Sequence, residues 1–442
     1  MAAAPVPGFQ TKDRTMHTPV SRTMQITPLL ALIGSVTFLQ GAAQAQSTGG
    51  AQAVKPPVAQ LWMDVATFTM PGMPEMPDVP AMGALGGLFG MPGSAAGSTF
   101  GNTRGMAPGR WVDIALYTQR KPAGTAGTQA VPQGTGLAPS LALHPPEEQS
   151  ARPAPGGGSL DETERPKGRI SFYWGCGDTV RPGQPRVLDF SRGGAQEWGN
   201  FMQGRAVRDR GAQARPGHAV WPNEKDPRRL GRDASIAGEH AVIGDGVPAG
   251  LKFEITKAHD LMPAIALAQS GSVADVLRLS WTPVGNARAY FMNAMSGGEA
   301  AGGGSEMVFW SSAELPDFGM GLMDYASPAN IDRWLREKVL LPASASQCAI
   351  PKGIFAKADG AVLRMIAYGP ELNLAYPPRP SDAKAAWEPE WAVRVRTKSA
   401  ALMPLGDHAT AGAGGQQPAA QNPTESARPP SALDMLRGVL GR

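Results

Sequence analysis

The stretch of residues 169–190, RISFYWGCGDTVRPGQPRVLDF, constrains the fold of this chain more than any other part of its sequence. Its apolar residues Ile170, Phe172 and Trp174 alternate with the residues between them, which is the period of a strand with one buried face. The residues that follow, GCGDTVRPGQP, are rich in Gly, Pro and Asp, which favour a reversal of the backbone. Val187 then lies in a return strand. The sequence therefore predicts a β-hairpin, which we place near the centre of an all-β protein.

The composition agrees with a β fold that has many turns. The 442 residues include 55 Gly and 42 Pro, which favours turns and long loops over a helical bundle. Hydrophobic residues make up 42%, which is enough for ordinary cores, and the length predicts about two domains. We therefore expect a mainly β fold with two β-sandwich-like domains, one inserted helix, a long Gly/Pro/Met-rich loop and disordered termini.

The N-terminal segment has the pattern of an export signal. Arg14 and Arg22 precede an apolar run at residues 26–39, and the sequence AQA at residues 43–45 supplies the small-x-small pattern of a cleavage site. The apolar run is too short, and too interrupted by Pro and Gly, to span a bilayer. We expect a signal peptide over residues 1–45, a periplasmic or secreted mature protein, and no transmembrane span after cleavage.

The charge balance bears on the choice of partner. Cleavage after the predicted signal removes three basic residues and one acidic residue, so the formal charge falls from +4 to about +2. A nucleic-acid-binding protein should carry its basic residues on one face or in one domain, and this balance does not predict one. The expected partner is an unknown envelope protein or a membrane surface.

An N-terminal β domain is predicted over residues 58–256, after a flexible leader of residues 46–57. Alternating apolar residues predict its first two strands at residues 59–69 and 110–120. Between them lies the loop of residues 70–108, which is rich in Met, Gly and Pro. A loop of this length inside a compact domain is usually functional or disordered.

A C-terminal β domain is predicted over residues 257–406. Strand patterns at residues 276–283 and 287–295 are joined by a tight VGN connection. The string LSWTPVGNARAY at residues 279–290 resembles the region of the second and third strands of fibronectin type III and related immunoglobulin-like domains. The resemblance implies a sandwich in which Trp281 packs between two sheets, and it implies no activity.

One helix interrupts this domain, and a polar tail follows it. Ser327 fits a helix N-cap and Pro328 fits the first helical position. Ile331 and Trp334 begin an apolar face at helical spacing. Residues 407–442 have low sequence complexity and are predicted to form a disordered tail with a short amphipathic end.

The mature chain as a whole is also similar to a group of uncharacterised secreted proteins of Gram-negative bacteria. The YWGCG and VRPGQP strings of the hairpin carry this resemblance, together with the C-terminal β region. It implies a location and a layout, and no activity.

The two cysteines of the chain, Cys176 and Cys348, are candidates for a disulfide. Export makes such a bond possible. It would close a loop of about 170 residues and contribute up to ~5 kcal/mol in the chain-entropy model. The alternative is two separately buried thiols.

The sequence contains none of the common catalytic signatures. It has no HExxH, CxxC or GxSxG string and no phosphate-binding loop of the GxxxxGK[ST] type. The leading hypothesis is therefore a non-catalytic binding or assembly module, although enzymatic activity stays open. One alternative is a hydrolase with a dispersed carboxylate site, because the distance between two carboxylates is not visible in a sequence.

The methionines of the long loop give a second alternative. Met70, Met73 and Met76 place three thioethers at a spacing of three residues, and soft thioethers suit Cu(I). A periplasmic copper-binding protein would use them in this way. Methionine is also a common residue of adaptable contact surfaces, so the same loop fits a partner or membrane contact, or no specific role. No other cofactor is predicted.

Overall fold

The computed structural model of the chain describes residues 52–71, 100–105, 107–146, 168–190, 195–299, 304–357, 360–382 and 384–406. These residues belong to one compact unit, Ala51–Arg442. The other unit, Met1–Gly50, lies outside the described residues, and so do the predicted signal peptide and tail.

The described part of the chain is mainly β. Its largest sheet has ten strands in the order β6-β5-β13-β12-β16-β17-β1-β2-β7, with β14 paired to β12. The strands of this sheet are β6 (Arg186–Asp189), β5 (Gly168–Trp174), β13 (Ser305–Ser311), β12 (Ala289–Glu299), β16 (Ala361–Tyr376), β17 (Trp391–Leu405), β1 (Ala59–Thr69), β2 (Gly109–Thr118), β7 (Ala219–Trp221) and β14 (Leu341–Pro342).

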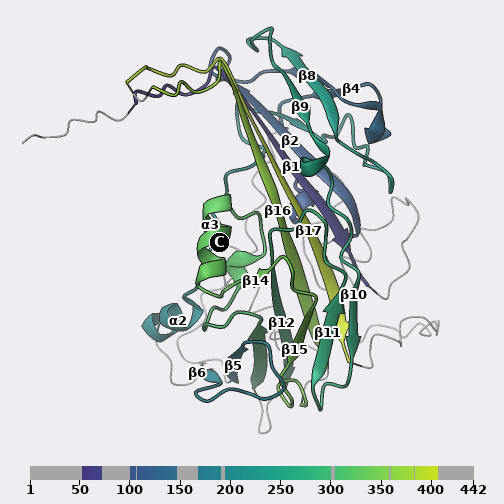
Figure 1. The fold of residues 1–442 in the computed structure, drawn as a ribbon, viewed down its shortest axis with the longest axis vertical. Helices are drawn as coiled ribbons and strands as arrows, with labels where there is room; N and C mark the ends of the chain where they lie inside the picture. Colours follow the sequence, from purple (N-terminus) through teal and green to yellow (C-terminus); the bar gives the residue numbers. More distant parts are fainter. Residues whose placement is uncertain are drawn as a thin grey trace, which may run out of the picture. The chain divides into compact units, whose positions relative to one another are not determined.

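Strands β16 and β17 run side by side through the middle of this sheet (Figure 1). Strand β1 pairs with β17 in parallel and with β2 antiparallel. Along β17, Val393 and Val395 lie on one face, while Arg394, Arg396 and Lys398 lie on the other, as the period of two requires. The sheet therefore has an apolar face and a polar face in its central strands.

Two smaller sheets cover the apolar face. One has the order β4-β3-β8-β9 and the other has the order β10-β11-β15. Their strands are β3 (Gly127–Ala130), β4 (Ser140–Leu143), β8 (Gly238–Gly244), β9 (Lys252–Ile255), β10 (Leu267–Ser270), β11 (Leu277–Trp281) and β15 (Gln347–Ile350).

Each small sheet shares an apolar core with the large one. In the first core, Leu143 and Val242 of the four-stranded sheet cluster with Leu61 and Val393 of the large sheet. In the second core, residues of the three-stranded sheet cluster with residues of the large one, namely Leu279, Trp281, Ile350, Met292, Leu363 and Met403. Burial of these side chains is the main source of stability on this face.

Helices α2 (Ala195–Met202) and α3 (Pro328–Arg336) and the 3-10 turns η2 (Asn102–Arg104) and η5 (Met320–Leu322) lie on the other face. The 3-10 turns η3 (Gln133–Thr135) and η4 (Lys257–His259) lie on the side of the small sheets. Helix α3 begins as predicted, because the Ser327 side chain accepts a hydrogen bond from the Asn330 amide. Its buried Ile331 and Trp334 pack near Phe291 of the large sheet. None of the helices in the described part has the length and apolar character needed to cross a bilayer.

The predicted hairpin forms, but at a different place. Strands β5 and β6 pair antiparallel, and they end one edge of the ten-stranded sheet instead of occupying its centre. Parallel pairing of β5 with β13 places it there, and a local sequence pattern does not specify such a long-range pairing. Strands from both sides of residue 257 share this sheet, because β1 lies between β17 and β2.

Candidate functional site

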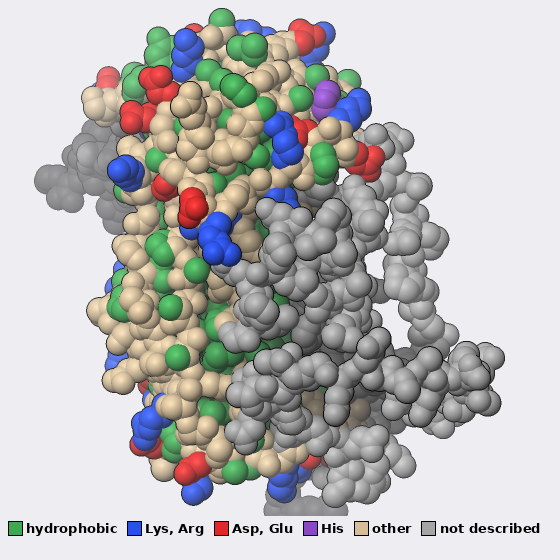
Figure 2. Space-filling view, turned by 90° about the vertical axis from the view of Figure 1, so that its right-hand side faces the viewer, with side chains coloured by type: hydrophobic (Ala, Val, Ile, Leu, Met, Phe, Trp, Pro, Cys, Tyr) green, Lys and Arg blue, Asp and Glu red, His purple; other side chains and the backbone are tan. Residues whose placement is uncertain are grey.

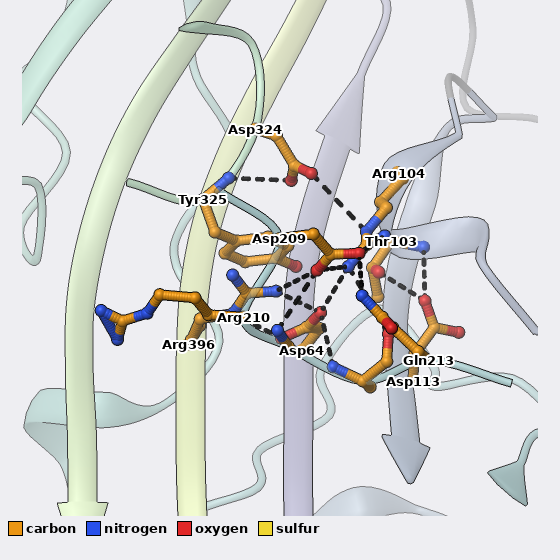
Figure 3. A network of polar contacts seen from close by, with 12 residues as sticks. Asp64, Thr103, Arg104, Asp113, Asp209, Arg210, Gln213, Asp324, Tyr325 and Arg396 are labelled. Atoms are coloured by element: carbon orange, nitrogen blue, oxygen red, sulfur yellow. Dashed lines mark hydrogen bonds and ion pairs between the residues drawn. The ribbon is translucent and has the colours of Figure 1, made fainter. Parts of the chain in front are cut away.

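The polar face of the large sheet buries charged side chains. Asp64 on β1, Asp113 on β2, and Arg396 and Lys398 on β17 are 1–5% exposed. Buried charges are strongly unfavourable unless they are paired and hydrogen-bonded. We call these four residues and their charged partners Arg104, Asp209 and Asp324 the polar network (Figure 3).

Asp64 and Arg396 form the centre of the polar network. They are opposite each other in the register of β1 and β17, and the guanidinium donates two hydrogen bonds to the carboxylate, at 2.7 and 2.6 Å. The Ala212 amide donates a third, at 3.1 Å. Burial opposes the charge on Arg396, but the bonds to Asp64 outweigh it and raise the pKa of Arg396. The guanidinium also lies over the Tyr325 ring, 4.4 Å from its centroid.

Asp113 lies beside Asp64, opposite it in the register of β1 and β2. Its carboxylate accepts hydrogen bonds from the Gly101 amide at 2.9 Å, the Thr103 amide at 3.2 Å and the Thr103 hydroxyl. Burial raises the pKa of Asp113 to about 6, even though these hydrogen bonds lower it, and the neighbouring Asp64 charge raises it further. The fold thus brings two carboxylates together, and every oxygen of the pair accepts hydrogen bonds from the protein.

An extended segment, residues 205–213, crosses the polar face and is held by charges along its length. Arg104 donates hydrogen bonds of 2.8 and 2.6 Å to Asp209. Arg210 donates one of 2.6 Å to Glu371 on β16. We call residues 205–213 the covering segment.

Gly211 allows the covering segment to approach the central ion pair. A Cβ atom at this position would lie 1.7 Å from Arg396 Nη2 and 2.2 Å from Asp64 Oδ2, which no side chain tolerates. The close approach also positions the Ala212 amide to donate to Asp64. The polar network and the absence of a side chain at Gly211 therefore depend on each other.

Lys398 is the second buried cation of β17. Its ammonium donates a hydrogen bond of 2.9 Å to Asp324 Oδ1 and lies 4.3 Å from the centroid of the Tyr325 ring. Burial lowers the pKa of Lys398, and Asp324 only partly offsets this. Burial would raise the pKa of Asp324, but the Lys398 charge lowers it below its usual range.

A small cavity of about 20 Å³ lies next to Lys398. Its lining, in the described part of the chain, includes three cationic side chains and no acidic one. These are Arg104, Arg364 and Lys398. Neither Asp64 nor Asp113 lines it.

The sequence-predicted candidates lie elsewhere. Cys176 and Cys348 form a disulfide with an S–S distance of 2.06 Å, which links the turn after β5 to β15. The alternative of two separate thiols does not occur. Met70 packs beside an apolar cluster of Phe68, Trp111 and Leu402.

The other two methionines of the copper hypothesis, Met73 and Met76, lie outside the described residues. Within the described ranges, no group of three or more His, Cys, Asp or Glu side chains is placed to hold a metal ion.

Comparison with known proteins gives no match to a family model, to a curated protein or to a solved structure.

Sequence reasoning did not find the polar network, although a signal for it exists. Asp64, Asp113 and Arg396 each stand in the middle of a strand that is otherwise largely apolar or β-branched. The alternation marks them as pointing away from the apolar core, which is also the pattern of a solvated strand face. What makes them buried is the covering segment, which comes from a distant part of the chain.

Proposed function

We propose that this chain is an exported protein of the periplasm or cell envelope, or a secreted one, that acts as a non-catalytic binding or assembly module. The observation that carries the proposal is the way the β1–β2 hairpin holds residues 70–108. Phe68 and Gly109 are partners in the register of β1 and β2, so the segment leaves and re-enters the large sheet at neighbouring positions. A segment of this length anchored at both ends on a rigid sheet is a common arrangement for binding loops.

Both ends of this segment are firmly fixed. On one side, Met70 packs with Phe68 and Trp111. On the other, the Trp111 indole donates a hydrogen bond of 2.8 Å to the Ala107 carbonyl. The turn η2 is held by Asp113, which accepts from its Thr103 amide. The sheet therefore supports a segment rich in Met, Gly and Pro, whose composition suits an adaptable contact surface.

The disulfide supports the proposed compartment. Disulfides persist in the periplasm and in secreted proteins and are rare where glutathione keeps thiols reduced. Both cysteines of the chain are used in this one bond. Together with the signal-like pattern of residues 1–45, this favours export.

The state of the buried carboxylates favours binding over hydrolysis. A glycosidase-like mechanism needs two carboxylates that face a substrate cleft. The Asp64 carboxylate accepts hydrogen bonds from Arg396 and from the Ala212 amide. The Asp113 carboxylate accepts hydrogen bonds from the η2 turn. Both are nearly fully buried, so we assign the pair an architectural role.

The surface charges and the layered sheets fit the same proposal. On the side of the molecule drawn in Figure 2, the coloured basic and acidic side chains are interspersed, unlike the concentrated basic surface of a nucleic-acid-binding protein. We also assign the two packed layers to the β-sandwich class, with the fibronectin-like string at residues 279–290 in support.

Partner capture tests the role of the segment. The full-length protein is expressed with its leader, and its partners are captured by crosslinking in the periplasmic fraction. In the test variant a short Gly/Ser linker replaces residues 72–99, and in the matched control a linker replaces residues 147–167. We expect the control to retain the partner set and the test variant to lose it.

Two further measurements complete this test. An equal melting temperature for both variants would show that the sheet is intact. An unchanged partner set without residues 72–99 would refute the role given to this segment. Mass spectrometry of the exported protein checks the compartment, because we expect a new N-terminus after Ala45 and no free thiol.

A further inference from the structure

The cavity beside Lys398 has a boundary made by several distant parts of the chain. Thr67 and Phe68 come from β1, Arg364 from β16, and Lys398 from β17. The turn η2 and Met323 complete the lining. With a volume of about 20 Å³ it accepts one particle of roughly the size of a water molecule.

The three cations that line the cavity differ in their partners. Lys398 is paired with Asp324 at 2.9 Å, and Arg104 with Asp209 at 2.6 Å. For Arg364, no residue in the described ranges supplies a side-chain hydrogen bond or an ion pair. Among the described residues that line the cavity, its guanidinium is therefore the cation without a paired carboxylate.

The environment of Arg364 is unfavourable to its charge. Burial lowers the pKa of Arg364, and no carboxylate in the described part of the chain opposes this effect. An arginine does not give up its proton under ordinary conditions, so it stays charged here. The Arg364 side chain is half-buried, so its charge is only partly hydrated, and a bound counter-ion would reduce the cost of this burial.

We propose that this cavity binds one small inorganic anion, and that chloride is the ion that fits it. The anion would offset the positive charge of Arg364 and would also be attracted by the charges of Lys398 and Arg104. Sulfate and phosphate carry several oxygens around a central atom and are larger than chloride, so they fit a space of this size less well. The site goes beyond the partner-binding role proposed above, although η2, which lines the cavity, also anchors one end of residues 70–108.

Thermal unfolding in matched salts tests the proposal. The mature protein is melted at pH 7.5 in sodium chloride, sodium bromide and sodium gluconate at equal ionic strength. We expect chloride and bromide to raise the melting temperature in a saturable way, on the order of 2 °C, relative to gluconate. Equal melting temperatures in all three salts would overturn the proposal.

A substitution separates ion binding from general salt effects. Arg364→Met keeps the length of the side chain and removes its charge. We expect this variant to lose the halide-dependent rise, while Arg278→Met, at an exposed arginine paired with Asp178, keeps it. If the cavity holds no anion, Arg364→Met instead removes a half-buried charge and changes the melting temperature equally in every salt.

Diffraction from bromide-soaked crystals of the unmodified protein gives an answer that does not depend on the variants. An anomalous peak between Arg364 and Lys398 would support the site. Its absence at saturating bromide would refute it.

Discussion

The two faces of the ten-stranded sheet are covered in different ways. On the apolar face, the two small sheets pack through side chains such as Leu61, Leu279 and Leu363, whose attraction has no direction. On the polar face, the covering segment is fixed by pairs of charges, such as Arg104 with Asp209 and Arg210 with Glu371. An apolar core tolerates small shifts of its cover, whereas a buried ion pair tolerates very few.

This difference indicates what each face contributes. Burial of apolar area supplies most of the free energy of folding. Buried ion pairs add little net stability, since the cost of removing the charges from water offsets their attraction. We infer that the polar network chiefly specifies where the covering segment lies. Substitutions on the two faces should therefore differ in whether a second substitution restores the lost stability. They should also differ in how their effects depend on pH and salt.

The largest effect is expected on the apolar face, where the disulfide ties the cover to the sheet. Replacing Cys176 and Cys348 by Ala releases a crosslink between residues 172 positions apart. We expect the free energy of unfolding to fall by up to ~5 kcal/mol, because the unfolded chain gains conformational freedom. Urea unfolding measures this loss, and the unmodified protein under reducing conditions should match the variant. The loss should not change between pH 6 and pH 8, and a strong pH dependence would contradict this account.

The next largest effect is expected at the centre of the polar face. Asp64→Ala leaves Arg396 buried without the carboxylate that accepts its two hydrogen bonds. Breaking a buried pair in this way costs about 3–5 kcal/mol. Urea unfolding should show a loss in this range.

A double variant distinguishes the two faces. Asp64→Leu combined with Arg396→Met removes both charges, and we expect it to recover most of the stability lost by Asp64→Ala. Leu363→Ala on the apolar face should cost about 2–5 kcal/mol, and no substitution at a single partner should restore it, because its loss is one of volume. A double variant no more stable than Asp64→Ala would show that the charges themselves are needed for stability.

The local pattern of the sequence predicted many of the strands and the helix α3. The alternation of AQLWMDVATFT predicted β1 with its observed bounds, and Ser327 with Pro328 predicted the start of α3. The string AVLRMIAY predicts a strand over residues 361–368, but β16 continues to Tyr376. Gly369 and Pro370, which usually end a strand, are accommodated at an irregularity between Tyr368 and Glu371.

The alternation of the sequence does not predict contacts between distant segments. The period of two shows which residues share a face, but it does not show that Asp64 meets Arg396, 332 positions away. It also leaves open which polar face is solvated. Arg364 in the string AVLRMIAY has the spacing of a solvent-facing residue, and the turn η2 and Met323 make it part of a cavity lining instead.

A smaller loss is expected where the covering segment touches the polar network. Gly211→Ala places a methyl group within 1.7 Å of Arg396 Nη2, so the segment or the ion pair has to move. We expect a loss of about 3 kcal/mol, at the upper end of the cost of overpacking, because a hydrogen-bonded pair is disturbed. Gly231→Ala is the matched control, since its added Cβ meets nothing within 4 Å. Equal stabilities of the two variants in urea would show that the covering segment adapts more freely than we infer.

The smallest effect is a gain in the free energy of unfolding, and the size of this gain depends on pH. Burial raises the pKa of Asp113 to about 6, above its ordinary value of 3.8. The folded state therefore favours the protonated carboxyl. The contribution of Asp113 to stability is greatest below pH 3.8 and is lost as the pH rises to about 6. Asp113→Asn removes the charge, so we expect a gain of about 2 kcal/mol at pH 7.5, after the loss of one hydrogen bond, and little gain near pH 4.

A histidine beneath the opposite face should show the reverse pH dependence. His240 accepts a hydrogen bond from the Gln129 amide at 3.0 Å and lies 2.9 Å from the Ile236 carbonyl, which requires the neutral ring to donate there. Burial lowers the pKa of His240, so its contribution to stability is present above pH 6.5 and is lost as the pH falls. Relative to the unmodified protein, His240→Gln should therefore gain stability on acidification, whereas Asp113→Asn should lose its advantage. Unfolding midpoints in urea between pH 4 and pH 8 measure both trends. If the stabilities of the two variants followed the same trend with pH, this would contradict the inference that His240 is held neutral on the apolar face while Asp113 contributes a buried charge on the polar face.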